Sequence, residues 1–582
     1  MAFATYIDNM CGIVGYVGNK NAIDVVYDGL KALEYRGYDS AGIATSNGKI
    51  EIFKTSGRVT DLLKKLPSRP CHTAIGHTRW ATHGAPTCAN AHPHLSYDGK
   101  IAVVHNGIVE NYSDLKQRVL AEGITFASDT DSEVIAHLLA LCSSSDFLQT
   151  VSKVADMIEG ATTFLAIREG DDKVYCSRRG ASLTIGVGLD ENFVTSDTLA
   201  VCDKTDKVMP LKDGDVAVIS KNEIAVFNGG QKVIRGVCQL NRTRPCESDC
   251  YMRTEIEEIP SAISRTIDRF FAEWDSSLTK KIKSADKIFF VGCGTAFHAC
   301  LYAVRVFKKV LNAPCEAVCS SEFDSSEVTA RTVAFFVSQS GETADTVLAA
   351  NECKRRGGFS VAICNVEGSL LSYTANAVLY TEAGAEVAVA ATKSYVCQLT
   401  LLFLLSKSVS GEILPQTFKR DFVSSLEKAV ALYRLPTIGY AEKLFFIGKG
   451  FDVITASEAA LKVKEITYKM TDAYPAGELK HGPIALIDKS SLAIVIATEK
   501  QDANRIKATI QELKSRGATI YAVSSLSDLS ADETILLPAP PDALLYPAVA
   551  IIPLERFALD TSLTLGLNPD KPRNLAKSVT VI

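Results

Sequence analysis

The sequence predicts a protein of mixed α/β and α+β architecture, with an α+β first half and a second half that repeats a doubly wound α/β unit. Up to about residue 235, strand-like and helix-like stretches follow one another irregularly, whereas beyond it buried strands alternate regularly with helices. In the second half, FFVGCG (289–294) and FFIGKG (445–450) share an apolar strand that ends in G-x-G, which indicates an internal duplication.

The first half is expected to form one layered α+β domain over residues 11–235. Its clearest elements are three short apolar strands and one helix, at 101–109, 162–169, 215–220 and 129–142 respectively. Residues 236–254 show little periodicity and contain a proline, so this stretch is expected to be a linker.

The second half is expected to hold two doubly wound domains with parallel sheets, at 278–415 and 436–572, followed by a tail at 573–582. A helix at 255–275 leads into the first domain. The predicted buried strands are 287–294, 332–341, 359–365, 443–450, 491–498 and 518–525. Because open parallel sheets bind ligands at the carboxyl ends of their strands, the polar residues that follow these strands are candidate site residues.

Composition excludes several function classes. The 582 residues are 47% apolar and 22% charged, and a formal net charge of −5 gives no reason to expect nucleic acid as a partner. The longest apolar run, 395–406, is too short to span a membrane and is typical of a buried helix. The first ten residues do not resemble a signal peptide, and the 16 cysteines include no zinc-type pair. We therefore expect free thiols in a cytoplasmic protein.

Cys11 directly follows a methionine and precedes the first apolar strand. If Met10 is the working start and is removed, Cys11 carries a free α-amine with a pKa of about 8, which can take the proton from its own thiol. We favour a misassigned start over a removed propeptide. The alternative for a lone cysteine is an ordinary small buried residue.

Two further stretches of the first half carry suitable chemistry. In HTRWATHG (77–84), the guanidinium of Arg79 can bind a carboxylate. In HNG (105–107), the Asn106 amide and the Gly107 N–H are suitable oxyanion donors for acyl transfer. Either stretch alone could be turn chemistry, but together with Cys11 they predict a thiol amidohydrolase.

The stretch SQSGET (338–343) follows a buried strand and opens a helix. Its three hydroxyls, its glycine and the helix N-terminus favour phosphate binding, and the alternative is simple helix capping. GCGTAF (292–297) lies at the end of an equivalent strand and could form a second wall. There is no GxxxxGK[ST] motif, so nucleoside triphosphates are not expected.

Three charged stretches of the second half have both a functional and an ordinary interpretation. Lys462 and Glu465 share a helix face, which ordinarily means a surface ion pair. His481 lies in a loop bounded by glycine and proline. Lys577 lies in an otherwise apolar tail, where a lysine is usually solvated but, if held in an apolar pocket, can form a Schiff base with a sugar ketone.

Taken together, these motifs resemble the glutamine–fructose-6-phosphate aminotransferases (isomerizing), also called glucosamine-6-phosphate synthases. The resemblance runs from Cys11 nearly to the last residue. It is carried by CGIVGYVG, LEYRGYDSAGIA, HTRWATHG, NAHPHL, HNGIVEN, SQSGETADT, ELKHGP and PRNLAKSVTV. It implies an N-terminal-nucleophile glutaminase domain with four α/β/β/α layers, followed by two sugar isomerase (SIS) domains.

For the glutaminase half, the resemblance implies that Cys11 attacks the glutamine side-chain amide. Asn106 and Gly107 then form the oxyanion hole, and Trp80 gates a channel for ammonia. The glutamine-binding residues that it implies are Arg79 for the carboxylate, Asp131 for the amino group, and Thr82, His83 and Gly107 as pocket lining.

For the isomerase half, the resemblance implies that Lys577 forms the Schiff base with fructose 6-phosphate and that Glu465 moves a proton between C1 and C2. It implies a homodimer in which the partner subunit's His481 assists ring opening. No metal or organic cofactor is implied. The sugar-phosphate-binding residues would be Thr295, Ser338, Gln339, Ser340, Thr343, Val389, Lys462 and Ala576.

The sequence departs from the family pattern at three places. Residues 1–10 would block the α-amine of Cys11 if they were retained, and Ala296 and Ala391 each stand where the family usually has serine. A lost hydrogen bond of this kind costs on the order of 1 kcal/mol, or about tenfold in affinity, so catalysis is expected to survive. The insertion typical of animal and fungal members is absent, so the chain looks bacterial in type.

Two rival functions are kept open. A non-catalytic sugar-phosphate sensor would explain Ala296 and a masked Cys11, but not the presence of Lys577, Glu465 and His481 together. A glutaminase that serves another acceptor, such as a phosphoribosyl substrate, does not account for the SQSGET loop or for the duplicated second half.

Overall fold

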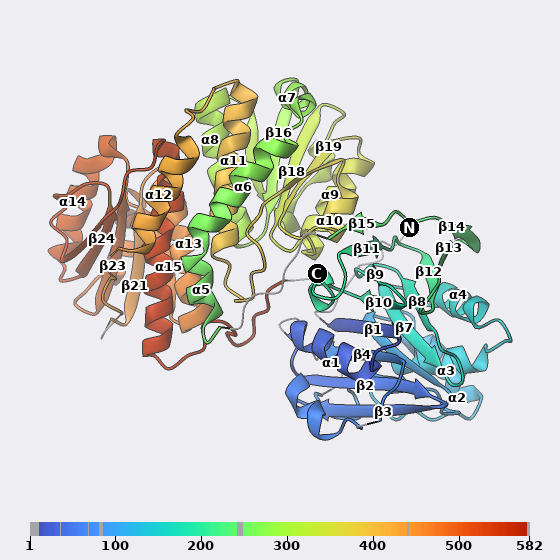
Figure 1. Cartoon of the computed structure of the whole chain (residues 1–582). Helices are drawn as coiled ribbons and strands as arrows, with labels where there is room; N and C mark the ends of the chain where they lie inside the picture. Colours follow the sequence, from blue (N-terminus) through green and yellow to red (C-terminus); the bar gives the residue numbers. More distant parts are fainter. Residues whose placement is uncertain are drawn as a thin grey trace. The chain divides into compact units, whose positions relative to one another are not determined.

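The computed structural model describes residues 11–34, 37–67, 69–80, 85–240, 248–432, 434–438 and 441–578. The chain divides into two compact units, Met1–Arg244 with Ser578–Ile582, and Pro245–Lys577. Figure 1 shows the elements of each unit.

The first unit contains two stacked, mainly antiparallel sheets. The eight-stranded sheet has the order β15-β11-β9-β10-β1-β4-β2-β3, and the seven-stranded sheet has the order β14-β13-β12-β8-β7-β6-β5. The strands of the first sheet are β1 (Gly12–Gly18), β2 (Ser40–Asn47), β3 (Lys49–Ser56), β4 (Thr73–Arg79), β9 (Thr184–Val187), β10 (Glu191–Thr195), β11 (Lys207–Pro210) and β15 (Cys238–Gln239). Those of the second are β5 (His94–Leu95), β6 (Ile101–Gly107), β7 (Thr162–Arg168), β8 (Val174–Arg178), β12 (Asp215–Ile219), β13 (Ile224–Asn228) and β14 (Gln231–Val233).

Helices cover the outer face of each sheet. Helix α1 (Ala22–Ala32) packs on β1 and β4 of the eight-stranded sheet. The seven-stranded sheet is covered by α2 (Tyr112–Ala121), α3 (Glu133–Leu141) and α4 (Phe147–Met157). A separate apolar core fills the space between the sheets, where side chains such as Ile13 and Ile75 of one sheet meet Val104 and Leu165 of the other. The expected four-layer α/β/β/α arrangement is therefore confirmed.

The second unit contains two five-stranded parallel sheets with matching strand order. They run β17-β16-β18-β19-β20 and β22-β21-β23-β24-β25. The first sheet consists of β16 (Lys287–Gly292), β17 (Cys315–Cys319), β18 (Thr332–Ser338), β19 (Phe359–Cys364) and β20 (Ala377–Tyr380). The second consists of β21 (Lys443–Gly448), β22 (Thr471–Pro475), β23 (Ser491–Ala497), β24 (Thr519–Ser524) and β25 (Glu533–Leu536). The expected duplication of a doubly wound unit is therefore confirmed.

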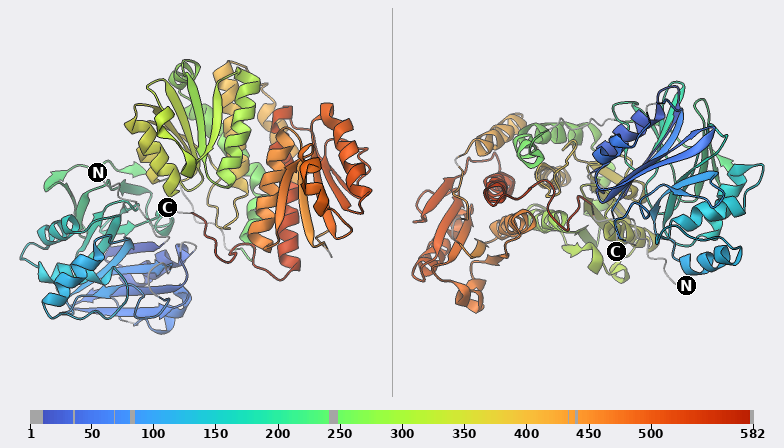
Figure 2. Two further views of the ribbon diagram at one scale, coloured as in Figure 1. Left: turned by 180° about the vertical axis from the view of Figure 1, so that it is seen from behind. Right: turned by 90° about the horizontal axis from the view of Figure 1, so that it is seen from below.

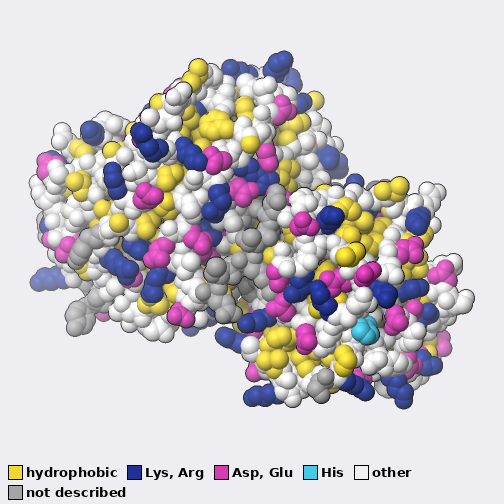
Figure 3. Space-filling view, in the orientation of Figure 1, with side chains coloured by type: hydrophobic (Ala, Val, Ile, Leu, Met, Phe, Trp, Pro, Cys, Tyr) yellow, Lys and Arg dark blue, Asp and Glu magenta, His cyan; other side chains and the backbone are white. Residues whose placement is uncertain are grey.

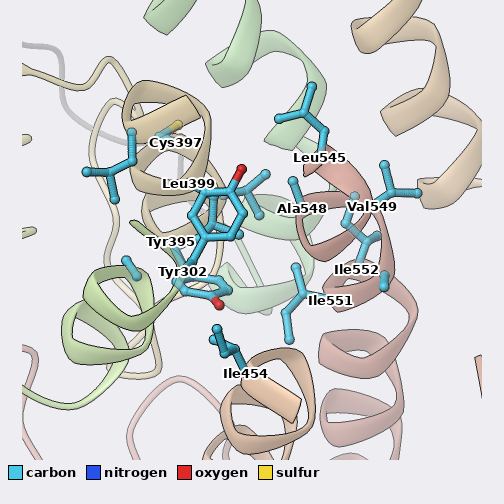
Figure 4. Packing of buried hydrophobic residues seen from close by; sticks show 14 of the residues in the cluster. Tyr302, Tyr395, Cys397, Leu399, Ile454, Leu545, Ala548, Val549, Ile551 and Ile552 are labelled. Atoms are coloured by element: carbon cyan, nitrogen blue, oxygen red, sulfur yellow. The ribbon is translucent and has the colours of Figure 1, made fainter. Parts of the chain in front are cut away.

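Helices cover both faces of each of these sheets (Figure 2). They are α5 (Tyr251–Glu257), α6 (Ile259–Glu273), α7 (Ser276–Lys283), α8 (Thr295–Leu311), α9 (Ala344–Arg355), α10 (Leu370–Thr374), α11 (Lys393–Ser410), α12 (Phe418–Val430), α13 (Phe451–Thr467), α14 (Ala503–Lys514) and α15 (Tyr546–Thr564). One large core joins the two repeats. Figure 4 shows part of it, where Tyr302, Tyr395, Ile454 and Ile551 from four different helices meet.

Among the predicted elements, two helices and the linker differ most from the structure. The helix expected at 255–275 is two helices, α5 and α6, because the chain breaks at Glu258 and restarts with Pro260 in its first turn. The helix expected at 129–142 begins only at Glu133. The stretch expected to be a linker, 236–254, contains β15, which pairs with β11, and the start of α5. The buried helix predicted from the apolar run 395–406 is confirmed as part of α11.

Charged side chains of both signs are interspersed over the face shown in Figure 3. No helix within the described part of the chain is long and apolar enough to span a membrane.

Candidate active sites in the two units

Cys11 lies where two central strands of the eight-stranded sheet come together. The antiparallel pairing of β1 with β4 sets Gly12 opposite Thr78, so Cys11 lies beside the end of β4. The backbone N–H of Trp80 donates to the Cys11 sulfur at 3.4 Å. Thr78 Oγ1 accepts from Gly12 N at 3.1 Å and Ser196 Oγ accepts from Ile13 N at 2.9 Å, which fixes the strand that carries the thiol. The Cys11 sulfur also lies 3.9 Å from the Trp80 carbonyl oxygen, so both backbone polar groups of Trp80 contact the thiol.

Asn106 and Gly107 reach the same place from the other sheet, at the end of β6. Asn106 Nδ2 donates to the Cys11 carbonyl oxygen at 3.1 Å. Gly107 has a φ of +122°, and a Cβ at this position would lie 1.8 Å from the Ala161 carbonyl oxygen. Only glycine can therefore turn the backbone here. The structure brings the predicted nucleophile and the predicted oxyanion donors together.

Arg79 and Asp131 are both buried near the thiol. The Arg79 guanidinium lies within electrostatic range of Cys11 and Asp131, and burial lowers its pKa from the ordinary value. Asp131 accepts from the backbone N–H of Val109 at 2.8 Å, which fixes its carboxylate. A positively charged side chain such as Arg79 can bind the α-carboxylate of an amino acid, and a negatively charged one such as Asp131 can bind its α-amino group. Thr82 and His83, the other expected pocket residues, lie outside the described residues.

The SQSGET loop connects β18 to α9 in the second unit. Ser338 Oγ accepts from Gly341 N at 3.1 Å and lies 2.9 Å from Thr343 Oγ1, and Ser340 Oγ accepts from Glu342 N at 3.1 Å. Gly341 has a φ of +66°, and a Cβ there would collide with the Ser369 hydroxyl. Thr343 precedes α9 but makes no capping hydrogen bond with its side chain. Helix capping by Thr343 therefore does not account for the loop.

Lys462 lies in a buried network between α8 and α13. Its side chain is fully buried, its Nζ lies 2.7 Å from Glu465 and 3.3 Å from Glu458, and it donates to Thr295 Oγ1 at 3.0 Å. The Thr295 hydroxyl donates to Glu458 at 2.9 Å. Burial alone would lower the pKa of Lys462, but the two glutamates raise it above its usual range. The ordinary interpretation of a surface ion pair is therefore wrong.

Glu458 also contacts His298, whose Nδ1 lies 2.6 Å from its carboxylate. Burial would raise the pKa of Glu458, but Lys462, His298 and Thr295 together lower it. Glu458 therefore stays ionised and fixes three side chains of the site. Glu465, in contrast, is partly exposed, with 20% of its side-chain surface accessible.

Lys577 is not solvated. Only 4% of its side chain is exposed, and its Nζ contacts Glu386, which is completely buried. Glu386 also accepts from Thr392 N at 3.1 Å, Ser394 N at 3.0 Å and Ser394 Oγ at 2.7 Å. Burial would raise the pKa of Glu386, but Lys577 and these donors lower it to about 2. The ionised carboxylate of Glu386 therefore fixes the position of Lys577 Nζ.

The remaining expected residues surround these groups. Val389 N donates to the Asp570 carbonyl oxygen at 3.1 Å, which ties its loop to the tail that carries Ala576 and Lys577. The Gln339 carbonyl oxygen accepts from Asn365 N at 3.0 Å. His481 ends a short 3-10 helix, Glu478–His481, and is exposed. Ala296 and Ala391, the two departures from the family pattern, are both partly exposed.

Sequence reasoning missed Glu386, Glu458 and His298. Glu458 precedes Lys462 by one helical turn, so helical spacing could have found it. Glu386 is separated from Lys577 by 191 residues, and no local pattern signals their pairing.

Two protein-family models match parts of this chain. The family model of the SIS domain matches residues 281–407 and 438–565, and that of the glutamine amidotransferase domain matches residues 77–185.

Two relatives are named glutamine–fructose-6-phosphate aminotransferase [isomerizing]. The protein from Caldanaerobacter subterraneus is 39% identical and that from Thermococcus kodakarensis is 38% identical, each over 98% of this chain and 100% of the relative. The solved C-terminal domain of glucosamine-fructose-6-phosphate aminotransferase from Francisella tularensis is 28% identical, covers 56% of this chain and 99% of its own, and has a TM-score of 0.50. This chain belongs to the family of the glutamine–fructose-6-phosphate aminotransferases (isomerizing).

Proposed function

We propose that the chain makes D-glucosamine 6-phosphate and L-glutamate from D-fructose 6-phosphate and L-glutamine, the first step of hexosamine synthesis. The observation that carries this proposal is the pair of sites in one chain. One holds a thiol together with Asn106, Arg79 and Asp131, and the other holds a buried lysine and a hydroxyl-rich loop.

In the first unit, the Cys11 thiolate attacks the side-chain amide carbon of glutamine. The carbonyl oxygen becomes an oxyanion that accepts hydrogen bonds from Asn106 Nδ2 and Gly107 N. Arg79 holds the α-carboxylate and Asp131 the α-amino group, with Thr82 and His83 completing the pocket. The C–N bond breaks, ammonia leaves with a proton from the α-ammonium of Cys11, and water hydrolyses the thioester to glutamate.

In the second unit, Ser338, Ser340 and Thr343 bind the phosphate, together with Gln339. Thr295, Val389 and Ala576 lie along the sugar. The neutral Nζ of Lys577, positioned by Glu386, attacks C2 of the open-chain ketose. Water leaves to give the Schiff base, and ammonia then displaces the lysine at C2. Glu465, held by Lys462, transfers the C1 proton to C2.

Ammonia released at Cys11 is consumed in the second unit, and Trp80 gates its passage. The Trp80 backbone contacts the thiol, so this residue lies where ammonia is released. The active form is a homodimer in which the partner's His481 opens the sugar ring; exposure of His481 supports this role. The compartment is the cytoplasm, which is supported by the lack of a disulfide among the cysteines that the structure describes.

Incubation of the full chain with glutamine and fructose 6-phosphate tests the proposal. Glucosamine 6-phosphate and glutamate in equal amounts are expected. A sugar-phosphate sensor would give neither product, and a glutaminase for another acceptor would give glutamate alone.

The start of the active chain needs a separate test, because the nitrogen of an amide is not basic. One expressed form begins at Met1 and carries Met10→Ala, and the other begins at Met10. Only the form whose mass shows Cys11 at its N-terminus is expected to hydrolyse glutamine. Equal hydrolysis by a form that retains residues 1–10 would rule out the α-amine as the base.

A further inference from the structure

His77 of β4 lies directly behind Asn106, and the mechanism above does not use it. Its ring is fully buried. Its Nε2 lies 3.0 Å from the His105 carbonyl oxygen and 3.1 Å from Asn106 Oδ1. The His105 carbonyl can only accept a hydrogen bond, so Nε2 must carry a proton.

The surroundings of Nδ1 and the pKa of His77 also place the proton on Nε2. His77 Nδ1 is buried and meets no hydrogen-bond partner among the residues that the structure describes. Burial lowers the pKa of His77 to about 3, so the ring is neutral at any working pH and holds its one proton on Nε2. The His92 ring stacks on it at 4.1 Å and 12°, and His92 Nδ1 in turn accepts from His105 N at 3.2 Å. The imidazole plane is therefore fixed.

This donor determines which way the Asn106 amide points. The amide nitrogen faces the Cys11 carbonyl oxygen at 3.1 Å, and the amide oxygen faces His77 Nε2. A flipped amide would place oxygen against the Cys11 carbonyl and N–H₂ against the imidazole N–H. Both contacts would be repulsive, so only one orientation is stable.

We propose that His77 is a positioning residue for glutamine hydrolysis, whose Nε2–H holds Asn106 Oδ1 so that the amide N–H₂ of Asn106 faces the developing oxyanion. The inference rests on the proposed oxyanion role of Asn106. Donation to Oδ1 also polarises the amide and strengthens its N–H as a donor when the electron pair of the attacked carbonyl moves onto oxygen.

A double-mutant cycle on glutamine hydrolysis by the full chain tests the inference. Asn106→Ala removes the donor and is expected to lower kcat about 100- to 1000-fold. His77→Leu is expected to lower kcat about 10- to 100-fold, with KM for glutamine changed less than about threefold. The double variant is expected to be no slower than Asn106→Ala, because His77 acts only through Asn106.

Two further variants separate positioning from packing. His77→Gln places an amide N–H near the site of Nε2 and is expected to recover most of kcat, whereas the shorter side chain of His77→Asn does not reach Asn106 and is expected to lose it. His137→Leu is the matched control. His137 is a buried imidazole of the same unit that packs on Phe126 and lies 3.3 Å from Glu133, and no contact between described residues joins it to Asn106, so kcat should stay within about twofold.

A transition-state mimic gives a readout that a purely structural role would not change. The γ-aldehyde of glutamate adds the Cys11 thiol across its C=O, so a C–S bond forms and the oxygen enters the oxyanion hole. His77→Leu and His77→Asn should weaken this inhibitor by at least about tenfold and leave the affinity for L-glutamate unchanged.

The outcomes are distinguishable. Full kcat in Asn106→Ala would overturn both the oxyanion role and this inference. A large loss in Asn106→Ala with full kcat in His77→Leu would overturn the inference alone. Losses that multiply in the double variant, or equal activity of His77→Gln and His77→Asn, would also overturn it.

Discussion

The two repeats of the second unit share a backbone and differ in what they present at its functional edge. Their sheets have the same strand order, and α8 and α13 each contain 17 residues. Gly294 precedes α8 with φ 54° and ψ −126°, and Gly450 precedes α13 with φ 62° and ψ −124°. Both glycines therefore adopt the same conformation, which other residues rarely adopt.

The difference lies in the loop after the central strand. Phe336 of β18 and Val495 of β23 hold equivalent positions in the strand register, so Ser340 of the first repeat matches Glu499 of the second. Glu499 accepts from Phe451 N at 3.0 Å, and Asp452 accepts from Thr498 N at 2.8 Å. In the second repeat, a carboxylate therefore stands at the position that matches Ser340, and it accepts a hydrogen bond from the N-terminus of α13.

The two repeats therefore contribute different residues to the candidate site. The first repeat presents neutral hydroxyls that can receive an anion, and the second supplies Lys462, Glu458 and Glu465 from α13. The two contributions meet at Thr295, which accepts from Lys462 and donates to Glu458.

We expect the largest effect when the side chain of Lys577 is removed. Lys577→Ala should abolish formation of glucosamine 6-phosphate, by at least about 1000-fold, because no other described group replaces a covalent nucleophile. Glutamine hydrolysis should continue, since the thiol and its partners lie in the other unit. Leu575→Ala, at an exposed position of the same tail, is the control. Product formation at the native rate by Lys577→Ala would rule out the Schiff base at this residue.

A reciprocal exchange between the repeats tests their difference. Ser340→Glu gives the first repeat the carboxylate of the second and should raise KM for fructose 6-phosphate at least about 100-fold, because like charges repel. Glu499→Ser makes the opposite change and should leave KM within about twofold. Steady-state kinetics with both variants measures KM for fructose 6-phosphate. Similar KM values for the two variants would contradict the proposed difference between the repeats.

A smaller change at the same position measures one hydroxyl. Ser340→Ala should weaken binding of fructose 6-phosphate by about tenfold and leave glutamine affinity unchanged, because one hydrogen bond to a charged group is worth about 1.5–3 kcal/mol and water replaces part of it. Titration calorimetry with each substrate checks this. An unchanged affinity for the sugar would place its phosphate elsewhere.

The smallest effect concerns the carboxylates of the second repeat. Burial raises the pKa of Asp452 from 3.8 to about 7, although Thr498 opposes the shift. Between about pH 4 and 7 the folded chain therefore binds more protons at this group than the unfolded chain, so stability falls as pH rises. Asp452→Asn should remove this fall, which amounts to a few degrees in melting temperature. If the melting temperatures of both proteins changed with pH in the same way over this range, the raised pKa of Asp452 would be contradicted.

Much of this architecture could be predicted from sequence, because periodicity and strand-end glycines are local signals. The cores of the predicted strands 287–294 and 443–450 are found as β16 and β21. The break at Glu258 was missed, since the apolar pattern continues across it and Pro260 is compatible with a first helical turn.

The residues of the site could be predicted from the sequence, but their burial and their charged partners could not. Lys462 and Lys577 were recognised through motifs, but their burial depends on Glu458 and Glu386, and the pairing of Lys577 with Glu386 depends on tertiary structure alone. The role that we assign to His77 likewise depends on a contact between strands of different sheets.

The central claim, that one sugar phosphate binds per chain and is held covalently by Lys577, is tested most directly by borohydride trapping. Sodium borohydride reduces the C=N bond of a Schiff base to a stable amine, so mass spectrometry and peptide mapping can count and locate the adduct. With fructose 6-phosphate and no glutamine, we predict one adduct per chain, on Lys577, which is lost in Ser340→Glu and kept in Glu499→Ser. An adduct on another lysine, or two adducts per chain, would contradict the account.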